Sequence, residues 1–265
     1  MKKPWTAQET ETLISLYGLR MNTQISEVLP GRSVDAIKQK GRYLGLKSNR
    51  KVTRKHYGID YDYFAVPNVQ NSYWAGFIAA DGCIDDVKDR VRIKLLESDG
   101  HHLATFKEHC GSGSPIRNSP NGVRNYAALE INGTGRWRAD LERNFCITAR
   151  KTLTLQPPNH LPRDLSLAFI TGYIDGDGCI FTEKPRTSHL RLGLHLVGTR
   201  EMLAWIQSWF NVLLPSIYTA NVNPCGKVWT YKIVGRKAEA VCRALLLMPT
   251  PKLARKWLKA EPFVT

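Results

Sequence analysis

The chain has 265 residues, 43% of them hydrophobic, which is enough for two or three small domains with buried cores. Its 38 Lys and Arg against 23 Asp and Glu give a net charge of +15, which favours a polyanionic partner such as nucleic acid. The six cysteines form no C-x₂-C pair, which argues against a zinc site or a disulfide framework. We expect no signal peptide and no membrane partner, because the chain contains neither type of apolar run. The expected location is the cytoplasm, for a bacterial or phage-encoded monomer associated with the nucleoid, with an organelle as the alternative.

Residues 1–47 are predicted to form three short helices. Thr6 and Glu9 form a capping box for the first helix, Pro30-Gly31 ends the second, and Ser33 caps the third. This order is typical of a helix-turn-helix domain. The pattern W-T-x-x-E followed by G-R-S-x-x-A-I-x-x-K resembles the Myb/SANT-type DNA-binding module. The resemblance implies that the third helix lies in the major groove, with Lys38, Gln39 and Arg42 facing DNA. An ordinary solvated helix is the alternative.

Residues 48–67 are predicted to be a basic linker. Residues 1–57 hold 12 Lys and Arg against 4 Asp and Glu, a net charge of +8 and more than half of the total. We expect Arg50, Lys51 and Arg54 to contact phosphates without reading sequence. A flexible hydrophilic tether would explain the same composition.

A repeated stretch follows the linker. Trp74 to Gly82 reads W-A-G-F-I-A-A-D-G, and Ile170 to Gly178 reads I-T-G-Y-I-D-G-D-G, with a period of 96 residues (177 − 81). Each copy is predicted to be a short helix that begins at Ser72 or Asn71 in copy one and at Asp164 in copy two, and ends at Gly82 or Gly178. Small residues on one face of each helix allow the two backbones to pack closely.

This packing would bring Asp81 and Asp177 together at the same end of the helix pair. Carboxylates at helix C-termini oppose the helix dipole, and two of them side by side repel each other. A divalent cation would relieve both effects, and carboxylate oxygens suit Mg²⁺. A simple Asp-Gly turn is the alternative for either copy. A calcium loop fits less well because further oxygen ligands are missing.

The two stretches resemble the paired motifs of the LAGLIDADG homing endonucleases, in their single-chain, two-motif form. The resemblance implies two pseudo-symmetric halves, residues 68–150 and 151–265, with an inter-half linker at 151–162. It also implies that Asp81 and Asp177 hold metal at the cleavage site, assisted by the carbonyls of Ala80 and Gly176. Copy one departs from the family pattern at Ala79, where an Asp is usual.

The predicted fold is α+β, with two αββαββα halves whose antiparallel sheets bind DNA, preceded by the three-helix domain. In half one we expect strands at 83–86 and 91–96, a helix at 99–110, a hairpin at 116–131 and a helix at 134–145. In half two we expect a strand at 189–196, a helix at 200–214, strands at 216–222 and 228–234 around a turn at 223–226, and a helix at 237–248.

Basic residues alternate with apolar ones along these strands. Arg90, Arg92 and Lys94 alternate with Val91, Ile93 and Leu95, while His189, Arg191, Gly193 and His195 alternate with leucines at 190, 192, 194 and 196. The polar faces are expected to contact DNA, together with Arg117, Arg124 and Asn125 near the hairpin turn. Charge for solubility is the alternative, although no acid occurs among Arg90, Arg92 and Lys94.

The family also carries a basic residue after each half that reaches the cleavage centre. Lys151, in R-K-T-L-T-L, matches that place, and Lys252 matches it by topology, with Arg150, Arg255 and Lys256 as rivals. The expected function is therefore a site-specific endonuclease for double-stranded DNA, which cuts one phosphodiester per strand with Mg²⁺; Mn²⁺ or Ca²⁺ could substitute in binding. A DNA-binding regulator without cleavage and an RNA maturase are the alternatives.

Overall fold

The computed structural model describes residues 4–17, 20, 22–46, 57–121, 124–184, 189–214 and 220–264, and only the backbone of residues 119–121 and 124. Backbone contacts divide the chain into an N-terminal unit, residues 1–55, and a C-terminal unit, residues 56–265. Within the described ranges, no helix is long and apolar enough to cross a lipid bilayer.

The N-terminal unit contains α1 (Ala7–Leu16), α2 (Asn22–Val28) and α3 (Val34–Tyr43). Leu13, Ile25, Leu29 and Ile37 form its core. The predicted capping box is present: the Thr6 amide donates to the Glu9 carboxylate at 2.8 Å, and the Glu9 amide donates to the Thr6 hydroxyl at 3.1 Å. Ser33 caps α3 as predicted by accepting from the Ala36 amide.

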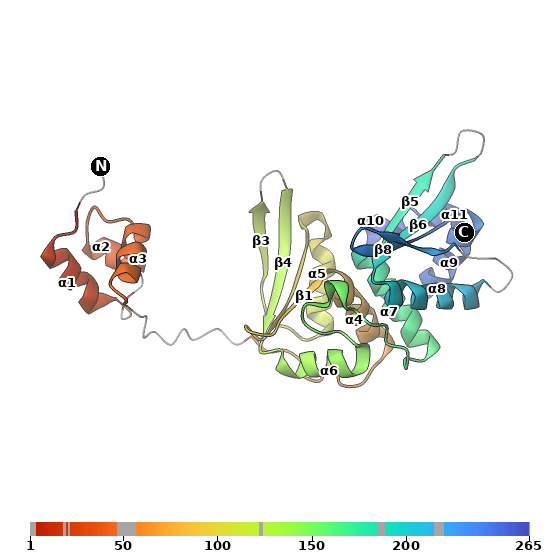
Figure 1. Ribbon diagram of the computed structural model, residues 1–265, viewed down its shortest axis with the longest axis horizontal. Coiled ribbons are helices and arrows are strands. Elements are labelled where there is room, and N and C mark those ends of the chain that lie inside the picture. Colours follow the sequence, from red (N-terminus) through yellow and green to blue (C-terminus); the bar gives the residue numbers. More distant parts are fainter. Residues whose placement is uncertain are drawn as a thin grey trace. The chain divides into compact units, whose positions relative to one another are not determined.

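The C-terminal unit contains the predicted repeat of helices and strands (Figure 1). Half one comprises α4 (Val69–Asp81), β1 (Gly82–Asp85), β2 (Arg90–Leu96), the 3-10 helix η1 (Glu97–Asp99), α5 (Gly100–His109), β3 (Ile116–Asn121), β4 (Arg124–Asn132) and α6 (Gly135–Phe145). The 3-10 helix η2 (Lys151–Leu153) leads into half two, which comprises α7 (Arg163–Asp177), β5 (Cys179–Glu183), β6 (Arg191–Gly198), α8 (Arg200–Leu213), β7 (Val222–Cys225), β8 (Val228–Val234) and α9 (Arg236–Leu246). Two short helices, α10 (Ala254–Trp257) and α11 (Glu261–Val264), follow.

Each half forms one antiparallel sheet, with strand order β1-β2-β4-β3 in the first and β5-β6-β8-β7 in the second. The predicted turn at 223–226 is wrong, because β7 continues through Cys225, which pairs with Val228. The chain reverses at Gly226, whose φ of +60° suits a residue without a side chain. Most of the strand predicted at 216–222 lies outside the described residues.

Helices α4 and α7 pack against each other between the two sheets (Figure 1). A Cβ on Gly76 would lie 1.9 Å from the Phe169 carbonyl oxygen, and one on Gly172 would lie 1.9 Å from that of Tyr73. These two contacts are reciprocal, because the repeat period relates Gly76 to Gly172 and Tyr73 to Phe169. The close packing predicted from the small residues is therefore confirmed, and the glycines are needed because backbone from one helix fills the space of their side chains.

The predicted starts of both motif helices are wrong. Helix α4 begins one turn earlier, with Asn68 as its cap, and Asn71 completes the capping box while Ser72 is buried inside the helix. Helix α7 follows Pro162, and Asp164 lies in its first turn without capping it. Gly82 ends α4 in an extended conformation, and a Cβ there would lie 2.7 Å from the Ile78 carbonyl oxygen. Close approach, not a left-handed conformation, therefore explains this glycine.

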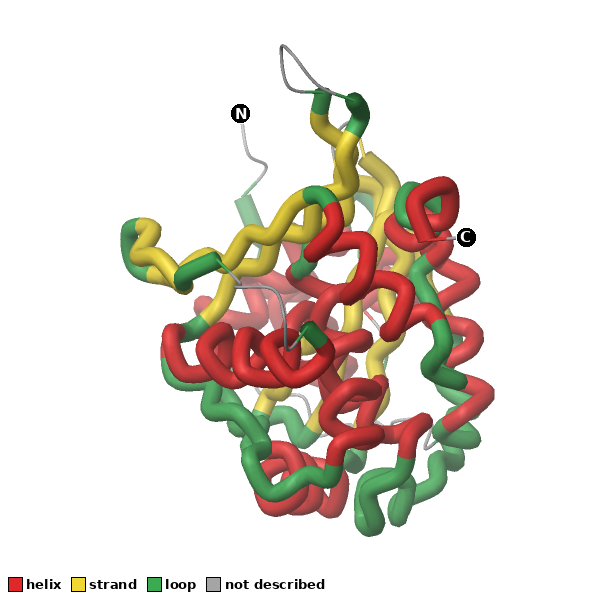
Figure 2. Tube along the Cα trace, turned by 90° about the vertical axis from the view of Figure 1, so that its right-hand side faces the viewer, coloured by secondary structure: helices red, strands yellow, loops and turns green. Residues whose placement is uncertain are grey.

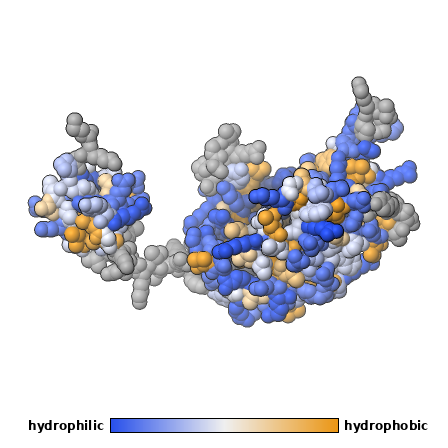
Figure 3. All heavy atoms as spheres, in the orientation of Figure 1, coloured by the Kyte–Doolittle hydropathy of each residue, from blue (hydrophilic) through white to orange (hydrophobic). Residues whose placement is uncertain are grey.

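Helices pack against each sheet, and Figure 2 shows helices lying beside the strands. Helix α5 packs on the first sheet, and α8 and α9 pack on the second. The predicted alternation is confirmed in β2, where Val91, Ile93 and Leu95 are buried. In β6 the leucines at 192, 194 and 196 are buried as predicted, but Gly193 between them is buried too, and Leu190 precedes the strand and is 52% exposed. The opposite faces of the sheets remain free of these helices. Figure 3 shows hydrophilic residues over most of one side of the unit, with hydrophobic residues scattered between them.

Candidate active site and nucleic-acid interface

Asp81 and Asp177 are the last residues of α4 and α7, where the two helices meet. A Cβ on Gly176 would lie 2.3 Å from the Cβ of Ala80, so the helix ends are in contact just before the two acids. Both residues reach solvent, but the surrounding protein partly buries their carboxylates. Asp177 also lines a cavity of about 220 Å³ together with Lys151 and Tyr173. The pair predicted from the repeat is thus placed at one end of the helix pair.

The surrounding protein makes charge on this pair unfavourable. Partial burial and the charge of Asp81 raise the pKa of Asp177 to about 6. Burial also raises the pKa of Asp81, against the opposing effect of Lys256, Lys151 and Arg255. Two carboxylates at helix C-termini, both with raised pKa values, form a site that gains free energy when positive charge binds.

Two buried lysines reach the same helix ends from two short helices. The Lys151 ammonium, at the start of η2, donates to the Ala80 carbonyl at 3.3 Å. The Lys256 ammonium, in α10, donates to the carbonyls of Ile174, Asp175 and Gly176 at 3.0, 2.7 and 2.6 Å. These side chains are only 8% and 5% exposed. Each lysine therefore supplies a positive charge where a helix dipole leaves unpaired carbonyls.

The two lysines and the two acids shift one another's pKa values, and each lysine acts more strongly on one of the two acids. Burial lowers the pKa of Lys151, while Asp177 and then Asp81 oppose this effect. Burial lowers the pKa of Lys256 to about 8, and the neighbouring carboxylates Asp175, Asp81 and Asp177 oppose it. Of the two lysines, Lys151 acts more strongly on Asp177 and Lys256 more strongly on Asp81. Lys151 thus caps α4 and acts more strongly on the acid of α7, whereas Lys256 caps α7 and acts more strongly on the acid of α4.

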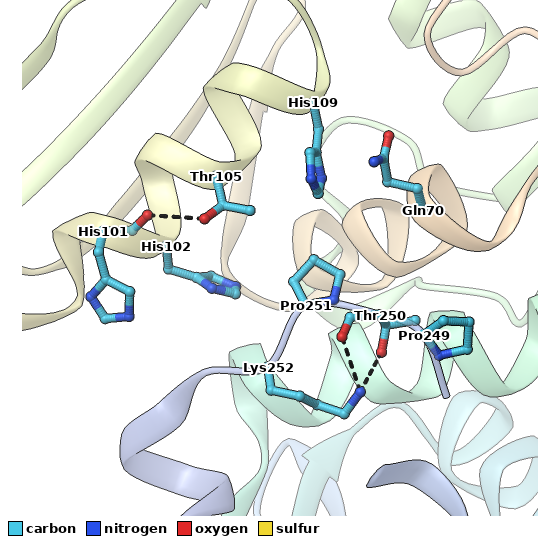
Figure 4. Close-up of a pocket in the computed structure, with 9 residues that line it drawn as sticks. All are labelled: Gln70, His101, His102, Thr105, His109, Pro249, Thr250, Pro251 and Lys252. Atoms are coloured by element: carbon cyan, nitrogen blue, oxygen red, sulfur yellow. Dashed lines mark hydrogen bonds between the residues drawn. The ribbon is translucent and has the colours of Figure 1, made fainter. Parts of the chain in front are cut away.

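The placement predicted for Lys252 is wrong. Its ammonium donates to Thr250 Oγ1 at 2.6 Å and to the carbonyls of Met248 and Thr250 at 3.0 and 3.2 Å. Figure 4 shows this side chain turned toward Thr250 beside a pocket of about 430 Å³, whose other wall includes His102. Lys256, one of the rivals, occupies the place expected for Lys252. The sequence did not separate them because α10 turns one lysine inward and leaves the other in the preceding loop.

The donor set at the helix ends suits Mg²⁺. Magnesium keeps several waters and is commonly bound by one or two carboxylates together with substrate phosphates. Asp81 and Asp177 provide two such carboxylates, and no cluster of three His, Cys, Asp or Glu side chains able to hold a metal occurs among the described residues. The carbonyls of Ala80 and Gly176, predicted as additional ligands, accept hydrogen bonds from Lys151 and Lys256. A metal would therefore depend on the carboxylates, unless the lysines move.

The outer face of the first sheet carries the predicted basic residues, but acids accompany them. Arg92 pairs with Glu130 across the strands, and the Glu130 carboxylate lies 3.1 Å from Arg90 and 3.8 Å from Arg92. Asp85 lies 3.3 Å from Arg90. The strand itself has no acid among its basic residues, but the neighbouring strands supply acids in space. Lys94 instead lies over the ring of Tyr126, 4.3 Å from its centroid.

The second sheet repeats this arrangement. Glu183 lies 2.7 Å from Arg191 and 3.1 Å from Lys232, a basic residue that the sequence did not single out. Gly193 is buried beneath the ring of Phe181, so it does not present an open surface. His195 is half-buried in β6, and His189 is exposed ahead of the strand. Lys232 could have been found from the alternation of β8.

The remaining predicted DNA contacts lie at hairpin ends and in the N-terminal unit. Arg117 and Asn125 are exposed on β3 and β4. Gln39 and Arg42 are exposed on α3, and Lys38 pairs with Asp35 at 3.2 Å. Arg50, Lys51, Arg54 and the side chain of Arg124 lie outside the described residues.

No protein-family model matches this sequence, and no curated protein matches it. Similar solved structures include the LAGLIDADG meganuclease I-AabMI bound to uncleaved DNA, with 14% identity over 74% of this chain and 88% of that chain and a TM-score of 0.47. The meganuclease I-SmaMI bound to uncleaveable DNA with a TTGT central four has 12% identity over 74% and 87%, with a TM-score of 0.49. Full-length DUF199/WhiA from Thermatoga maritima has 14% identity over 77% and 64%, with a TM-score of 0.47. At these identities the likeness concerns the path of the chain and assigns no residue a role.

Proposed function

We propose that this protein is a site-specific DNA endonuclease that hydrolyses one phosphodiester in each strand of a long target. One observation carries the proposal: a two-fold repeat brings two carboxylates, Asp81 and Asp177, to adjoining helix ends, each with a buried lysine nearby. Two equivalent sets of groups suit the two antiparallel strands of a duplex. The resemblance of the repeated motifs to those of the LAGLIDADG homing endonucleases supports the same reaction.

Each group in the site has a role in this mechanism. Asp81 and Asp177 would hold Mg²⁺, which would supply polarisation of a phosphate oxygen and a lowered pKa for a bound water. Lys151 and Lys256 place positive charge beside the reacting phosphates, where negative charge grows in the transition state. Burial lowers the pKa of Lys256 to about 8, so this group can also exchange a proton near neutral pH.

DNA binding is assigned to the open faces of the two sheets and to α3. The basic residues of the sheets include Arg90, Arg92, Lys94, Arg117, Arg191 and Lys232. Pairing with Glu130 and Glu183 fixes the direction of several of these side chains. A guanidinium held in one direction can recognise guanine, while the remaining carboxylate oxygen can accept from cytosine. The basic linker adds affinity that is independent of sequence.

A cleavage assay on a randomised duplex library with Mg²⁺ tests this proposal, because the target is unknown. Sequencing of the ends is expected to show staggered cuts at one recurring long site, and Asp177→Asn is expected to bind that site without cutting it. Full-rate cleavage by the variant would show that Asp177 does not belong to the site.

A DNA-binding regulator without cleavage is the second candidate. Hydrogen bonds from Lys151 and Lys256 engage the carbonyls of Ala80 and Gly176, and the lysine charges offset those of the two carboxylates, which weakens the attraction for a metal at these helix ends. This candidate would be favoured if the protein enriched one duplex sequence by binding and produced no cleaved DNA ends in the presence of Mg²⁺ or Mn²⁺.

A further inference from the structure

Asp175 is a fully buried carboxylate in the second motif helix, and the equivalent position in the first motif is Ala79. Its Oδ2 atom accepts from the Tyr73 hydroxyl at 2.6 Å and from the Leu253 amide at 2.9 Å. Its Oδ1 atom accepts from the Trp257 indole N–H at 2.6 Å. Three donors thus converge on one side chain, one from α4 and two from the end of the chain.

These contacts join both halves to the end of the chain. Tyr73 belongs to α4, and its hydroxyl also lies 2.7 Å from His102 Nε2 in α5. Leu253 and Trp257 belong to the segment of residues 249–258, here named the C-terminal strap. A second contact between the strap and half one is the ion pair of Arg255 with buried Asp99, at 2.5 Å.

The C-terminal strap carries Lys256, whose ammonium reaches the end of α7. On one side the strap borders the pocket shown in Figure 4, where Pro249, Pro251 and Lys252 face the side chains of α5 across about 430 Å³. Packing is reduced along this side, so directed hydrogen bonds matter more for holding the strap. Asp175 makes two of those bonds, on either side of Lys256 in sequence.

Lys151 is held by different contacts. Its carbonyl accepts from the amides of Thr154 and Leu155 at 3.0 and 2.9 Å. The Leu155 carbonyl in turn accepts from the Thr199 hydroxyl at 2.7 Å. Ala79 contributes no polar side chain on this side. The anchor of Lys151 therefore does not involve Asp175 or the C-terminal strap.

We propose that Asp175 is a positioning residue for Lys256: its carboxylate holds the C-terminal strap so that the Lys256 ammonium stays at the α7 end beside the acid pair. Its effect on DNA cleavage rests on the proposed nuclease function. Because Lys151 has a separate anchor, the two lysines depend on different parts of the chain. Loss of Asp175 is expected to slow cleavage of the DNA strand that depends on Lys256 more than cleavage of the other DNA strand.

Acetylation of the full-length protein by acetic anhydride, followed by peptide mass spectrometry, tests the positioning without DNA. In Asp175→Asn an amide N–H₂ faces a donor, so at least one strap hydrogen bond is broken. Lys256 is expected to become acetylated severalfold faster, while Lys151 keeps its native rate. Trp257→Phe removes one hydrogen-bond donor of the strap and keeps the Asp175 carboxylate, so this variant replaces Asp175→Asn in the assay if Asp175→Asn does not fold. Trp137→Phe is the matched control, because its buried indole donates to the Asp60 carbonyl instead.

Strand-resolved cleavage tests the consequence for the reaction. The substrate is the duplex recovered from the randomised library, labelled on each strand in turn. Lys256→Met and Lys151→Met first identify the strand that depends on each lysine. Asp175→Asn is then expected to slow the Lys256-dependent strand about 10- to 100-fold more than the other, a size typical of losing a group that orients a functional residue. Duplex affinity is expected to stay unchanged, so the loss appears in the rate and not in binding.

The outcomes separate this inference from the proposed function. Native protection of Lys256 in both variants, or equal exposure in Trp137→Phe, overturns the positioning role. Equal slowing of cleavage of both DNA strands in Asp175→Asn would show that Lys151 and Lys256 do not have separate anchors. Faster acetylation of Lys256 in a protein that cuts no duplex in any divalent metal upholds the positioning role and refutes the nuclease.

Discussion

The Lys256 ammonium donates a 2.6 Å hydrogen bond to the carbonyl of Gly176, the residue immediately before Asp177. Lys151 makes the corresponding contact to Ala80, the residue immediately before Asp81, at 3.3 Å. The pseudo-symmetry of the chain therefore extends beyond the repeated motifs to two lysines whose sequence contexts differ.

Lys256→Met is expected to lower the cleavage rate about 10- to 1000-fold, because it removes a buried charge beside the acid pair. Lys252→Met is the matched comparison, four residues earlier, and is expected to cut near the native rate because the Lys252 ammonium is bound to its own loop. Single-turnover kinetics on the recovered target measure both variants. The reverse order of effects would restore Lys252 to the site.

Asp177→Asn is expected to raise the thermal unfolding midpoint at pH 7.5 without divalent metal. The pKa of Asp177 is about 6 in the folded protein, above the value near 3.9 of an unfolded chain. Between those two values the folded state binds more protons, so this group lowers stability as pH rises from about 4 to about 6, and the cost remains above pH 6. The variant lacks this cost, so its advantage is expected to shrink at pH 4.

Calorimetric scans of both proteins at the two pH values measure this difference. Addition of Mg²⁺ is expected to stabilise the native protein more than the variant, because the metal binds the folded acid pair. An Asp177→Asn advantage that is equal at both pH values would contradict the assigned titration.

Gly172→Ala is expected to destabilise the C-terminal unit by about 1–3 kcal/mol or more, because the new Cβ overlaps the Tyr73 carbonyl of the facing helix. Gly58→Ala is the control, since a Cβ there meets no atom within 4 Å. Urea unfolding monitored by tryptophan fluorescence compares the two. Native stability in Gly172→Ala would contradict the close contact of α4 and α7.

Glu130→Gln is expected to reduce discrimination between target and random duplexes while tightening binding to random DNA. The glutamate holds Arg90 and Arg92 in place and offsets their charge, so its loss frees two basic side chains to find any phosphate. Glu142→Gln, an equal change in charge at an exposed position of α6, controls for net charge. Competition binding at fixed salt measures the ratio, and equal ratios in both variants would place Glu130 away from DNA.

Removal of residues 1–55 is expected to leave a folded unit that still cuts but binds more weakly. The removed part holds 12 Lys and Arg against 4 Asp and Glu, and its few internal helices form a separate core. For each phosphate that the shortened protein no longer neutralises, the salt slope of log affinity is expected to fall by about 0.9. Fluorescence anisotropy at salt concentrations from about 50 to 200 mM measures this slope, because contacts with DNA phosphates weaken strongly over that range. An unchanged slope would show that the N-terminal unit does not bind DNA.

Local signals in the sequence predicted most of the secondary structure. The Thr6–Glu9 capping box and the alternation around Val91 and Ile93 were correct because neighbouring residues decide both features. The start of α4 was wrong because Asn71 resembles a helix cap. It is instead the residue that completes the capping box begun by Asn68, and the apolar pattern does not distinguish the two positions.

The sequence by itself determined the two-fold repeat and, through it, the meeting of Asp81 and Asp177, because small residues at matched positions permit the motif helices to pack closely. Tertiary structure alone decided which lysine reaches this centre, which acids neutralise the arginines of the sheets, and what holds Asp175 in the core. Those relationships join residues far apart in the chain, such as Asp175 and Trp257 or Glu183 and Lys232. They depend on where loops and neighbouring strands place their side chains, and no local pattern specifies that.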